Sequence, residues 1–440
     1  MPWLPNSERD RREMLDAVGV ESVEGLFADI PASLRETAAP DLPDPLSEME
    51  LVEEARALAG QNRSLDELVC FAGGGIYDHF IPAVVQSVTG RPEFVTPYTP
   101  YQPEASQGTL EAMFEYQTMI CELTGMDIAN ASLYDGATAL GEAVLLAADV
   151  TRRGRALISA ALSPVARRAT RTYCEATGIE IVEMPFDEET GQTDLGALAE
   201  MLDDDVACVA LQQPNYFGVL EEMQDAADHA HEAGALFTTM VEPTSLALLT
   251  PPGEYEADLV VGEGQPLGLP PGYGGPLLGI FACREEYLRR MPGRVVGRTV
   301  DADGETAYCL TLQTREQHIR RGRATSNICT NQGLCALAAC VYLAAMGPEG
   351  LREVALLGAE RAHQLQGLLS EAGLQAHFSG DVLNEFVVRV PGGAESRVHD
   401  ACEQGYLVGP ALGRHFADLD DCLLVAATER RTAEEVEALA

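Results

Sequence analysis

Between residues 106 and 284 the sequence alternates apolar segments of strand length with segments of helical spacing. The strand-like segments are 155–159, 179–185, 206–214, 235–242, 257–262 and 277–284. The first helical segment carries Leu110, Met113, Ile120 and Leu123 at helical spacing and ends at Gly125. Strands that alternate with helices imply right-handed crossovers and a mainly parallel sheet covered on both faces. We therefore predict a large α/β domain over residues 66–330.

Two regions of different character flank this domain. Residues 1–65 form short helical patterns with polar linkers, and "SEME" (47–50) and "SLDE" (64–67) both match the capping box that begins a helix. Residues 331–440 contain two long helical patterns, then strand-like segments at 384–390 and 422–429 with helices between and after them. We predict an N-terminal helical arm and a C-terminal α+β domain. This outline is typical of the aspartate-aminotransferase-like fold.

The composition indicates a soluble protein without metal or disulfide chemistry. There is no run of 18 apolar residues, and the N-terminus lacks the layout of a secretion signal, so we expect a cytoplasmic protein. The 11 cysteines include no CxxC pair and are mostly in apolar segments, which favours buried, inert thiols. His229 and His231 are two positions apart, so on a helix they point apart and do not indicate a metal site.

The charge balance is extreme. Acidic residues number 69 against 29 basic ones, for a formal net charge of −40, which argues against nucleic-acid and anionic-membrane partners. All 29 basic residues are arginine, so no lysine amine exists to form a Schiff base with pyridoxal phosphate. The acidic excess suggests a halophilic source. Codon bias towards arginine is the alternative, but it would not explain the excess of acidic residues.

The familiar short motifs of catalysis are absent or incomplete. "GEGQPLG" (262–268) approaches a dinucleotide fingerprint but continues into "LPPG" instead of a helix, and no Walker loop, GxSxG or HExxH motif occurs. The loop after the strand-like segment 257–262 has the shape that presents a catalytic side chain. It offers only Gln265 and Tyr273, neither of which is a nucleophile.

Three other stretches are candidate functional segments. Gly73, Gly74 and Gly75, shortly before His79, allow a turn and close approach of another group. "PYTPYQPE" (97–104) is a stiff aromatic and polar loop that presents Tyr98, Tyr101, Gln102 and Glu104, although composition alone favours a surface turn with solvated tyrosines. "TREQHIRRGRATSNICTNQ" (314–332) places Arg315, Arg320, Arg321 and Arg323 before Thr325, Ser326 and Asn327. Such a cluster suits a phosphate or carboxylate, or else a hub of internal ion pairs.

The longest of these stretches resemble one family. "YTPYQPEASQG", "YQTMICELTGMDIANASLYDG" and "REQHIRRGRATSNICT" are similar to the α subunit of the P-protein of the glycine cleavage system, glycine dehydrogenase (decarboxylating). The resemblance implies a pyridoxal-phosphate fold of type I. It also implies that pyridoxal phosphate is bound covalently by a paralogous β subunit and not by this chain. Here Arg323 replaces a lysine that the family usually has before "ATSNICT".

The resemblance also accounts for the loop without a nucleophile. Counted back from Pro270 and "GYGGP", Gln265 falls where the β subunit would carry its Schiff-base lysine. Met240 falls near the position of the aspartate that would contact the cofactor ring nitrogen, with Glu242 close by. A chain that lacks both groups cannot hold the cofactor in the usual way.

The implied function is that of a subunit without catalytic residues of its own. With a β subunit, in an α2β2 assembly, it would decarboxylate glycine and pass the aminomethyl group to lipoylated H-protein. We hypothesise that Tyr98, Tyr101 and Gln102 line the substrate or lipoyl entrance of the β subunit. We also hypothesise that Thr325, Ser326 and Asn327 approach the cofactor phosphate or its neighbourhood. Two alternatives remain open: a purely structural partner of the β subunit, and a stand-alone pyridoxal-phosphate enzyme with an unconventional anchor.

The acidic excess predicts that stability depends on salt. At about 1 M salt the screening length falls to about 3 Å, so the mutual repulsion of the carboxylates is largely removed. The free energy of unfolding, measured in urea, should therefore rise from low to molar KCl. Equal stability throughout this range would contradict a halophilic adaptation.

Overall fold

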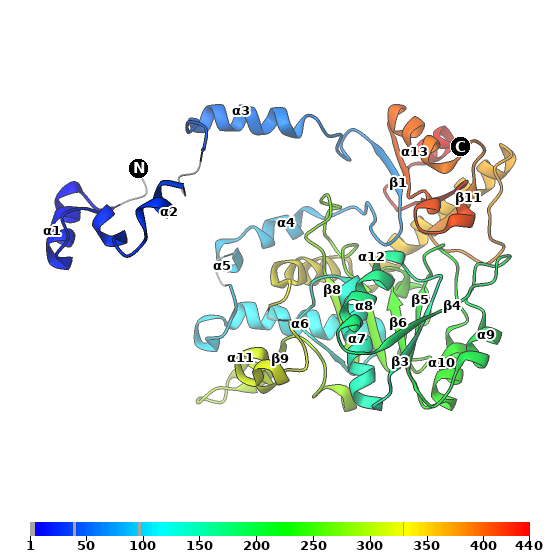
Figure 1. Cartoon of the computed structure of the whole chain (residues 1–440). Coiled ribbons are helices and arrows are strands. Elements are labelled where there is room, and N and C mark those ends of the chain that lie inside the picture. The colour runs from blue at the N-terminus through cyan, green and yellow to red at the C-terminus, as the bar shows by residue number, and fades with distance from the viewer. Residues whose placement is uncertain (1–4, 38–40, 96–97, 329) are drawn as a thin grey trace. The chain divides into compact units, whose positions relative to one another are not determined.

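The computed structural model describes residues 5–37, 41–95, 98–328 and 330–440. Two compact units, Met1–Arg63 and Ser64–Ala440, each have their own internal contacts (Figure 1). The second unit contains all of the strands.

In its described residues the first unit contains three α-helices, α1 (Glu8–Val18), α2 (Ala32–Thr37) and α3 (Glu48–Ala59). The predicted capping box at Ser47 is confirmed, because Ser47 and Glu50 bond each other's backbone N–H groups. The match at 64–67 was misleading. The N–H of Ser64 does donate to Glu67, but these residues form a turn that leads into strand β1 (Val69–Ala72) instead of a helix.

The second unit is built on a mainly parallel seven-stranded sheet, as predicted. The strand order is β2-β8-β7-β6-β5-β3-β4, in which β2 and β7 run antiparallel to β8 and the other neighbours are parallel. The strand bounds are β2 (Ile128–Ala129), β3 (Arg155–Ser159), β4 (Glu180–Met184), β5 (Val206–Gln213), β6 (Leu236–Val241), β7 (Leu259–Glu263) and β8 (Gly279–Cys283).

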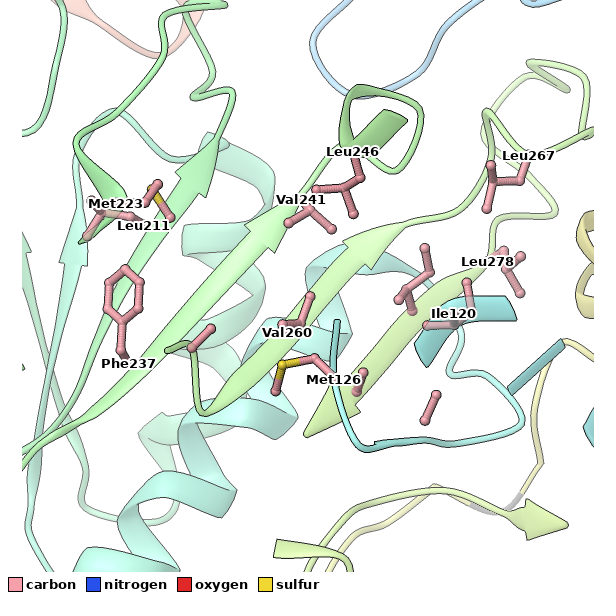
Figure 2. Close-up of a cluster of buried hydrophobic side chains, with 14 of the residues drawn as sticks. Ile120, Met126, Leu211, Met223, Phe237, Val241, Leu246, Val260, Leu267 and Leu278 are labelled. Carbon is pink, nitrogen blue, oxygen red and sulfur yellow. The ribbon is translucent and has the colours of Figure 1, made fainter. Parts of the chain in front are cut away.

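Side chains alternate between the two faces of this sheet, as a strand period of two requires. On β5, Val209 and Leu211 join one core cluster, whereas Cys208 and Ala210 join the other. Figure 2 shows part of the first cluster, in which side chains of several strands lie together with Ile120. The sheet is therefore apolar on both faces, which explains why its strands read as continuous apolar runs.

Helices supply the other half of each core cluster. They are α6 (Gln107–Thr124), α7 (Gly136–Thr151), α8 (Pro164–Glu175), α9 (Leu195–Met201) and α10 (Met223–Glu232). The predicted face of α6 is largely confirmed, since Leu110, Met113 and Ile120 are buried, although Leu123 is only partly so. Gly125 ends α6 in a left-handed conformation with φ of 69°, which glycine adopts without strain.

The long helix α12 (Gly333–Glu371) is two helices joined at a kink, as the sequence suggests. Gly347 has non-helical backbone angles, and Pro348 follows it. Among the described residues α12 is the one helix that is long and apolar enough to cross a membrane. Its first half contributes Ala336, Ala339 and Tyr342 to the first core cluster, which is typical of a core helix.

The C-terminal lobe pairs β11 (Glu385–Arg389) with β13 (Cys422–Ala426), with α13 (Ala394–Glu403) and α14 (Ala433–Leu439) nearby in the chain. Its β12 (Tyr406–Gly409) pairs in parallel with β1, an unpredicted strand whose residues lie in the range expected for the large domain. The hairpin of β9 (Val295–Val300) and β10 (Thr306–Thr311) was not foreseen. Three short helices, α4 (Ala83–Thr89), α5 (Pro92–Val95) and α11 (Gln317–Arg320), complete the set of α-helices in the described residues.

Residues 73–80 are bound tightly to this C-terminal lobe. The N–H of Gly74 and the hydroxyl of Tyr77 both donate to Glu385, at 2.9 and 2.7 Å. A Cβ at position 73 would collide with Glu385 and lie 2.7 Å from the Ala426 Cβ, so only glycine permits this approach. The segment is thus fixed by buried hydrogen bonds to a carboxylate.

The buried Glu385 predicts a specific pH dependence. Burial raises its pKa from 4.5 to about 7, against the lowering effect of its hydrogen bonds. The folded protein then binds this proton more tightly than the unfolded chain does. The contribution of proton binding to the free energy of unfolding is therefore complete below pH 4.5 and is lost as the pH rises to about 7. The shift corresponds to roughly 3 kcal/mol.

Glu385→Gln should flatten the fall in unfolding free energy between pH 4.5 and about 7, because an amide does not titrate. Urea unfolding across this pH range measures the effect. The exposed Glu434→Gln serves as the control and should leave the profile unchanged. A Glu385→Gln profile parallel to that of the unmodified protein would contradict the prediction.

Candidate functional site

Gln265, the residue at the position expected for a lysine, is fully buried just after β7. Its Oε1 accepts from the backbone N–H of Tyr77 at 2.9 Å, and its Nε2 donates to the carbonyl oxygens of Tyr77 and Leu269 at 3.0 and 2.7 Å. Both ends of the amide are therefore satisfied by backbone groups. Gln265 joins the β7–β8 loop to residues 73–80 and offers no reactive atom.

Glu263 lies two residues earlier and faces the first turn of α7. Its carboxylate accepts from the N–H groups of Gly136, Gln265 and Leu278 at 3.0, 3.0 and 2.9 Å. Burial raises its pKa to about 7, although these three hydrogen bonds act in the opposite direction. A helix N-terminus attracts anions. At α7 that role is taken by a carboxyl group of the chain itself.

The neighbouring strand β6 likewise provides no partner for a cofactor ring. Met240 is buried in the second core cluster. Glu242 is buried too, and it accepts from the N–H groups of Thr244 and Ser245 at 3.0 and 2.7 Å, which fixes the turn after β6. With no amine at 265 and no free carboxylate beside it, these residues do not fit covalently bound pyridoxal phosphate.

Several of the residues singled out in the sequence line one or the other of two cavities elsewhere in the second unit. The larger has a volume of about 1390 Å³ and is bounded by α7, the end of α8, the segment after β8 and the 320–328 loop. Arg323, Thr325, Ser326 and Asn327 line it. Further arginines of its lining are Arg152, Arg153, Arg289, Arg290, Arg315 and Arg320.

The four arginines of the predicted cluster have different environments. Arg315 is tied to the backbone, donating to the carbonyl oxygens of Leu312, Met291 and Gly293, and burial lowers its pKa. Arg320 donates to the carbonyl of Thr314 at 3.2 Å. Arg321 and Arg323 are exposed. Among the described residues none of the four forms an ion pair with a carboxylate, so the alternative of an ion-pair hub is not supported.

The smaller cavity, of about 500 Å³, is lined by Tyr98, by Asn331 and Gln332 just before α12, and by the first turn of α12. Tyr98 is 82% exposed. Tyr101 lies beside the buried Arg294, whose guanidinium donates to the Tyr101 hydroxyl at 3.2 Å and lies 5.5 Å from its ring centroid. Both tyrosines are exposed, as a surface loop would have them, but Tyr101 is also bonded to Arg294.

The remaining candidates are not brought into either cavity. Gln102 and Glu104 are exposed at the short 3₁₀ turn Pro103–Ala105. Gly73, Gly74, Gly75 and His79 belong to the junction with the C-terminal lobe, where His79 Nδ1 lies 2.7 Å from the Glu429 carboxylate. One connection does approach both cavities: the rings of Tyr101 and His318 are 6.1 Å apart, and the adjacent Gln317 donates to Asn327 at 3.0 Å.

Three contributing residues escaped prediction. Arg294 also donates to Thr330 and Asn331, at 3.3 Å each, and so ties the tyrosine loop to the start of α12. Glu142 is buried at the wall of the larger cavity. Its signal in the sequence is a single carboxylate within the otherwise small and apolar 136–148 stretch. Asn331 and Arg294 have no comparable signal, because their contacts depend on distant segments.

The described part of the chain shows neither a cluster of metal-binding side chains nor a disulfide. It contains no group of three or more His, Cys, Asp or Glu residues that could hold a metal, and the imidazole of His231 bonds Asp258 at 2.8 Å. The ten described cysteines are free, and most are buried, as expected; burial raises the pKa of Cys208 to about 12. Cys329 lies outside the described residues.

Comparison with known proteins agrees with the fold and with the motifs. The family model of the glycine cleavage system P-protein matches residues 1–440. The probable glycine dehydrogenase (decarboxylating) subunit 1 of Moorella thermoacetica is 49% identical over 440 residues, covering 100% of this chain and 98% of that protein. The protein of the same name from Thermotoga maritima is 47% identical over 438 residues, covering 100% and 98%.

Solved structures extend the comparison. A crystal structure titled glycine decarboxylase (P-protein) of the glycine cleavage system, in inhibitor-bound form, superposes with a TM-score of 0.93 at 45% identity, covering 100% of this chain and 98% of that one. The aspartate aminotransferase of Thermus thermophilus superposes at 0.58 with 14% identity, covering 84% of this chain and 96% of that one, which confirms the predicted fold alone. The chain belongs to the P-protein family of the glycine cleavage system.

Proposed function

We propose that this chain is a subunit of glycine dehydrogenase (decarboxylating) and that it acts only together with a second subunit, which carries pyridoxal phosphate. The observation that supports this proposal is the state of Gln265. It is buried, its amide is fully hydrogen-bonded, and no lysine exists anywhere in the sequence. The name "subunit 1" of the relatives implies such a partner.

In this assignment the partner supplies the electron-withdrawing chemistry of the cofactor, and this chain supplies walls of the shared site. The exposed Tyr98, with Tyr101 and Gln102, would line the entrance for glycine and for the lipoyl group of the H-protein. Thr325 and Asn327 are exposed in the larger cavity and would face the partner's cofactor phosphate. Ser326 is less suited to that task, since its hydroxyl donates to Glu142.

The assembly and setting follow from the same proposal. The two subunits would form an α2β2 complex in the cytoplasm, with lipoylated H-protein as the transient partner and glycine as the substrate. The chain would comprise an N-terminal arm (1–65), a large domain (66–330) and a C-terminal domain (331–440), with β1 contributed to the last of these.

A purely structural partner is the second candidate. It is favoured because polar groups near the larger cavity form hydrogen bonds within the chain. The Arg315 guanidinium donates to the Gly293 carbonyl, and the Ser326 hydroxyl donates to Glu142. The two candidates differ in whether substitutions at exposed cavity residues change turnover or only assembly.

Cofactor binding tests the main proposal. Pyridoxal phosphate added to the isolated chain should give no aldimine absorbance, because no ε-amine is present. Co-expression with the second subunit should give a complex that shows this absorbance and exchanges glycine carboxyl with bicarbonate. Glycine decarboxylation by the isolated chain would overturn the proposal.

Substitutions at Tyr98 and Thr325 test the role of the cavity walls. In the reconstituted complex, Tyr98→Ala and Thr325→Ala should each lower glycine–bicarbonate exchange by about tenfold, equivalent to about 1.4 kcal/mol of transition-state stabilisation. The exposed Val300→Ala is the control and should be neutral. Unchanged turnover with altered assembly in both variants would favour the purely structural partner.

A further inference from the structure

Glu142 is an isolated carboxyl group inside the second unit. It belongs to α7, and only 3% of its surface is exposed. It forms no ion pair among the described residues, although arginines line the adjacent cavity. Its hydrogen bond is to the hydroxyl of Ser326, at 2.7 Å. Burial of a carboxylate without a cation costs free energy of folding. A carboxyl group in such a place therefore calls for a functional explanation.

The packing around Glu142 leaves it little freedom. A Cβ carbon on the preceding residue, Gly141, would lie 2.9 Å from the Tyr173 ring, so α7 and α8 are in close contact at this point. Burial also raises the pKa of Glu142 to about 7, while the Ser326 hydrogen bond lowers it. Near neutral pH the group is therefore partly protonated, and its carbonyl oxygen can accept a hydrogen bond in either state.

Ser326 connects Glu142 to the 323–328 loop through two hydrogen bonds. Its hydroxyl donates to Glu142 and accepts from the N–H of Ile328 at 3.0 Å. The Ile328 side chain is buried in the same core cluster as Leu140 and Val144 of α7. The loop is thus attached to α7 at two points: through the apolar side chain of Ile328 and through the Ser326 hydroxyl.

The residues beside these anchors are more exposed than the anchors themselves. Thr325 and Asn327 are exposed and line the larger cavity, whereas Glu142 is too buried to touch a substrate. We propose that Glu142 is a positioning residue, which through Ser326 holds the 323–328 loop so that Thr325 and Asn327 face the shared active site. This inference rests on the proposed function and adds to it a residue from within the fold.

The effect on the loop can be measured on the chain alone. In Glu142→Leu, hydrogen–deuterium exchange of the 323–328 amides should become faster, because the Ser326 hydroxyl loses its acceptor. Glu142→Gln should exchange like the unmodified chain, since its amide oxygen still accepts. The exposed Glu200→Leu on α9 is the matched control and should also leave this loop unchanged. Unaltered exchange in Glu142→Leu would overturn the inference.

The effect on function is measured in the complex with the second subunit. Glu142→Leu and Ser326→Ala should each lower glycine–bicarbonate exchange by about tenfold or more, as expected when a site residue is displaced. The double variant should be no worse than either single variant, because both remove the same anchor. Glu142→Gln should retain activity within about threefold, which a requirement for the negative charge would not allow.

The outcomes separate this inference from the proposed function. An active complex in which Glu142→Leu is as active as the unmodified protein, or in which the two single effects add, would overturn the positioning role and leave the proposed function intact. If the unmodified complex exchanges no glycine, the proposed function fails, and the amide-exchange experiment still decides whether Glu142 holds the loop.

Discussion

The hydrogen bonds of Gln265 with the backbone of Tyr77 connect the two halves of the second unit. Through them the β7–β8 loop is joined to residues 73–80, which in turn bond Glu385 of β11. An amide suits this task because it both donates and accepts, so it can satisfy a backbone N–H and a backbone carbonyl together. A lysine ammonium has no acceptor and would leave the Tyr77 N–H without a partner. The residue at this position therefore stabilises the fold by joining two segments that are far apart in the chain.

The same region shows how this acidic protein accommodates carboxylates in its interior. Glu385, Glu263 and Glu142 have pKa values raised by burial to about 7, and each accepts hydrogen bonds from N–H or hydroxyl groups. Hydrogen-bond donors partly offset the cost of burial, and a proton removes the remaining charge as the pH falls. Elsewhere the solution differs, since the buried Asp78 is paired with Arg430 and Arg431. The charge of Asp78 is thus compensated by two arginines of the C-terminal lobe, whereas that of Glu263 on β7 is compensated by backbone N–H groups.

Much of the fold could be predicted from the sequence because its signals are local. The period of α6 and the apolar runs of β5 and β6 follow from adjacent residues, and the alternation of strands and helices implies a parallel sheet. The pairing of β1 with β12 could not be foreseen, because these short strands lie more than 300 residues apart in the chain. The capping-box match at Ser64 shows that a local signal can also mislead. The hydrogen bond that it predicts is present, but a strand follows it instead of a helix. For the site, the position of Gln265 could be found by counting along a motif, whereas its partners could not.

The division of the polar loops between two cavities has a physical consequence for the way such a chain can contribute to catalysis. Tyr98 lies in one cavity and Thr325 in the other, and one link between the two loops runs through the Tyr101–His318 ring contact and the Gln317–Asn327 hydrogen bond. Among the described residues, the lining of neither cavity includes a histidine or a cysteine. The two cavities are lined by exposed aromatic and hydroxyl groups. Their loops are held by hydrogen bonds to the buried Arg294 and Glu142. Loops of this kind can complete a site whose reactive group comes from another chain, because their geometry is set before that chain arrives.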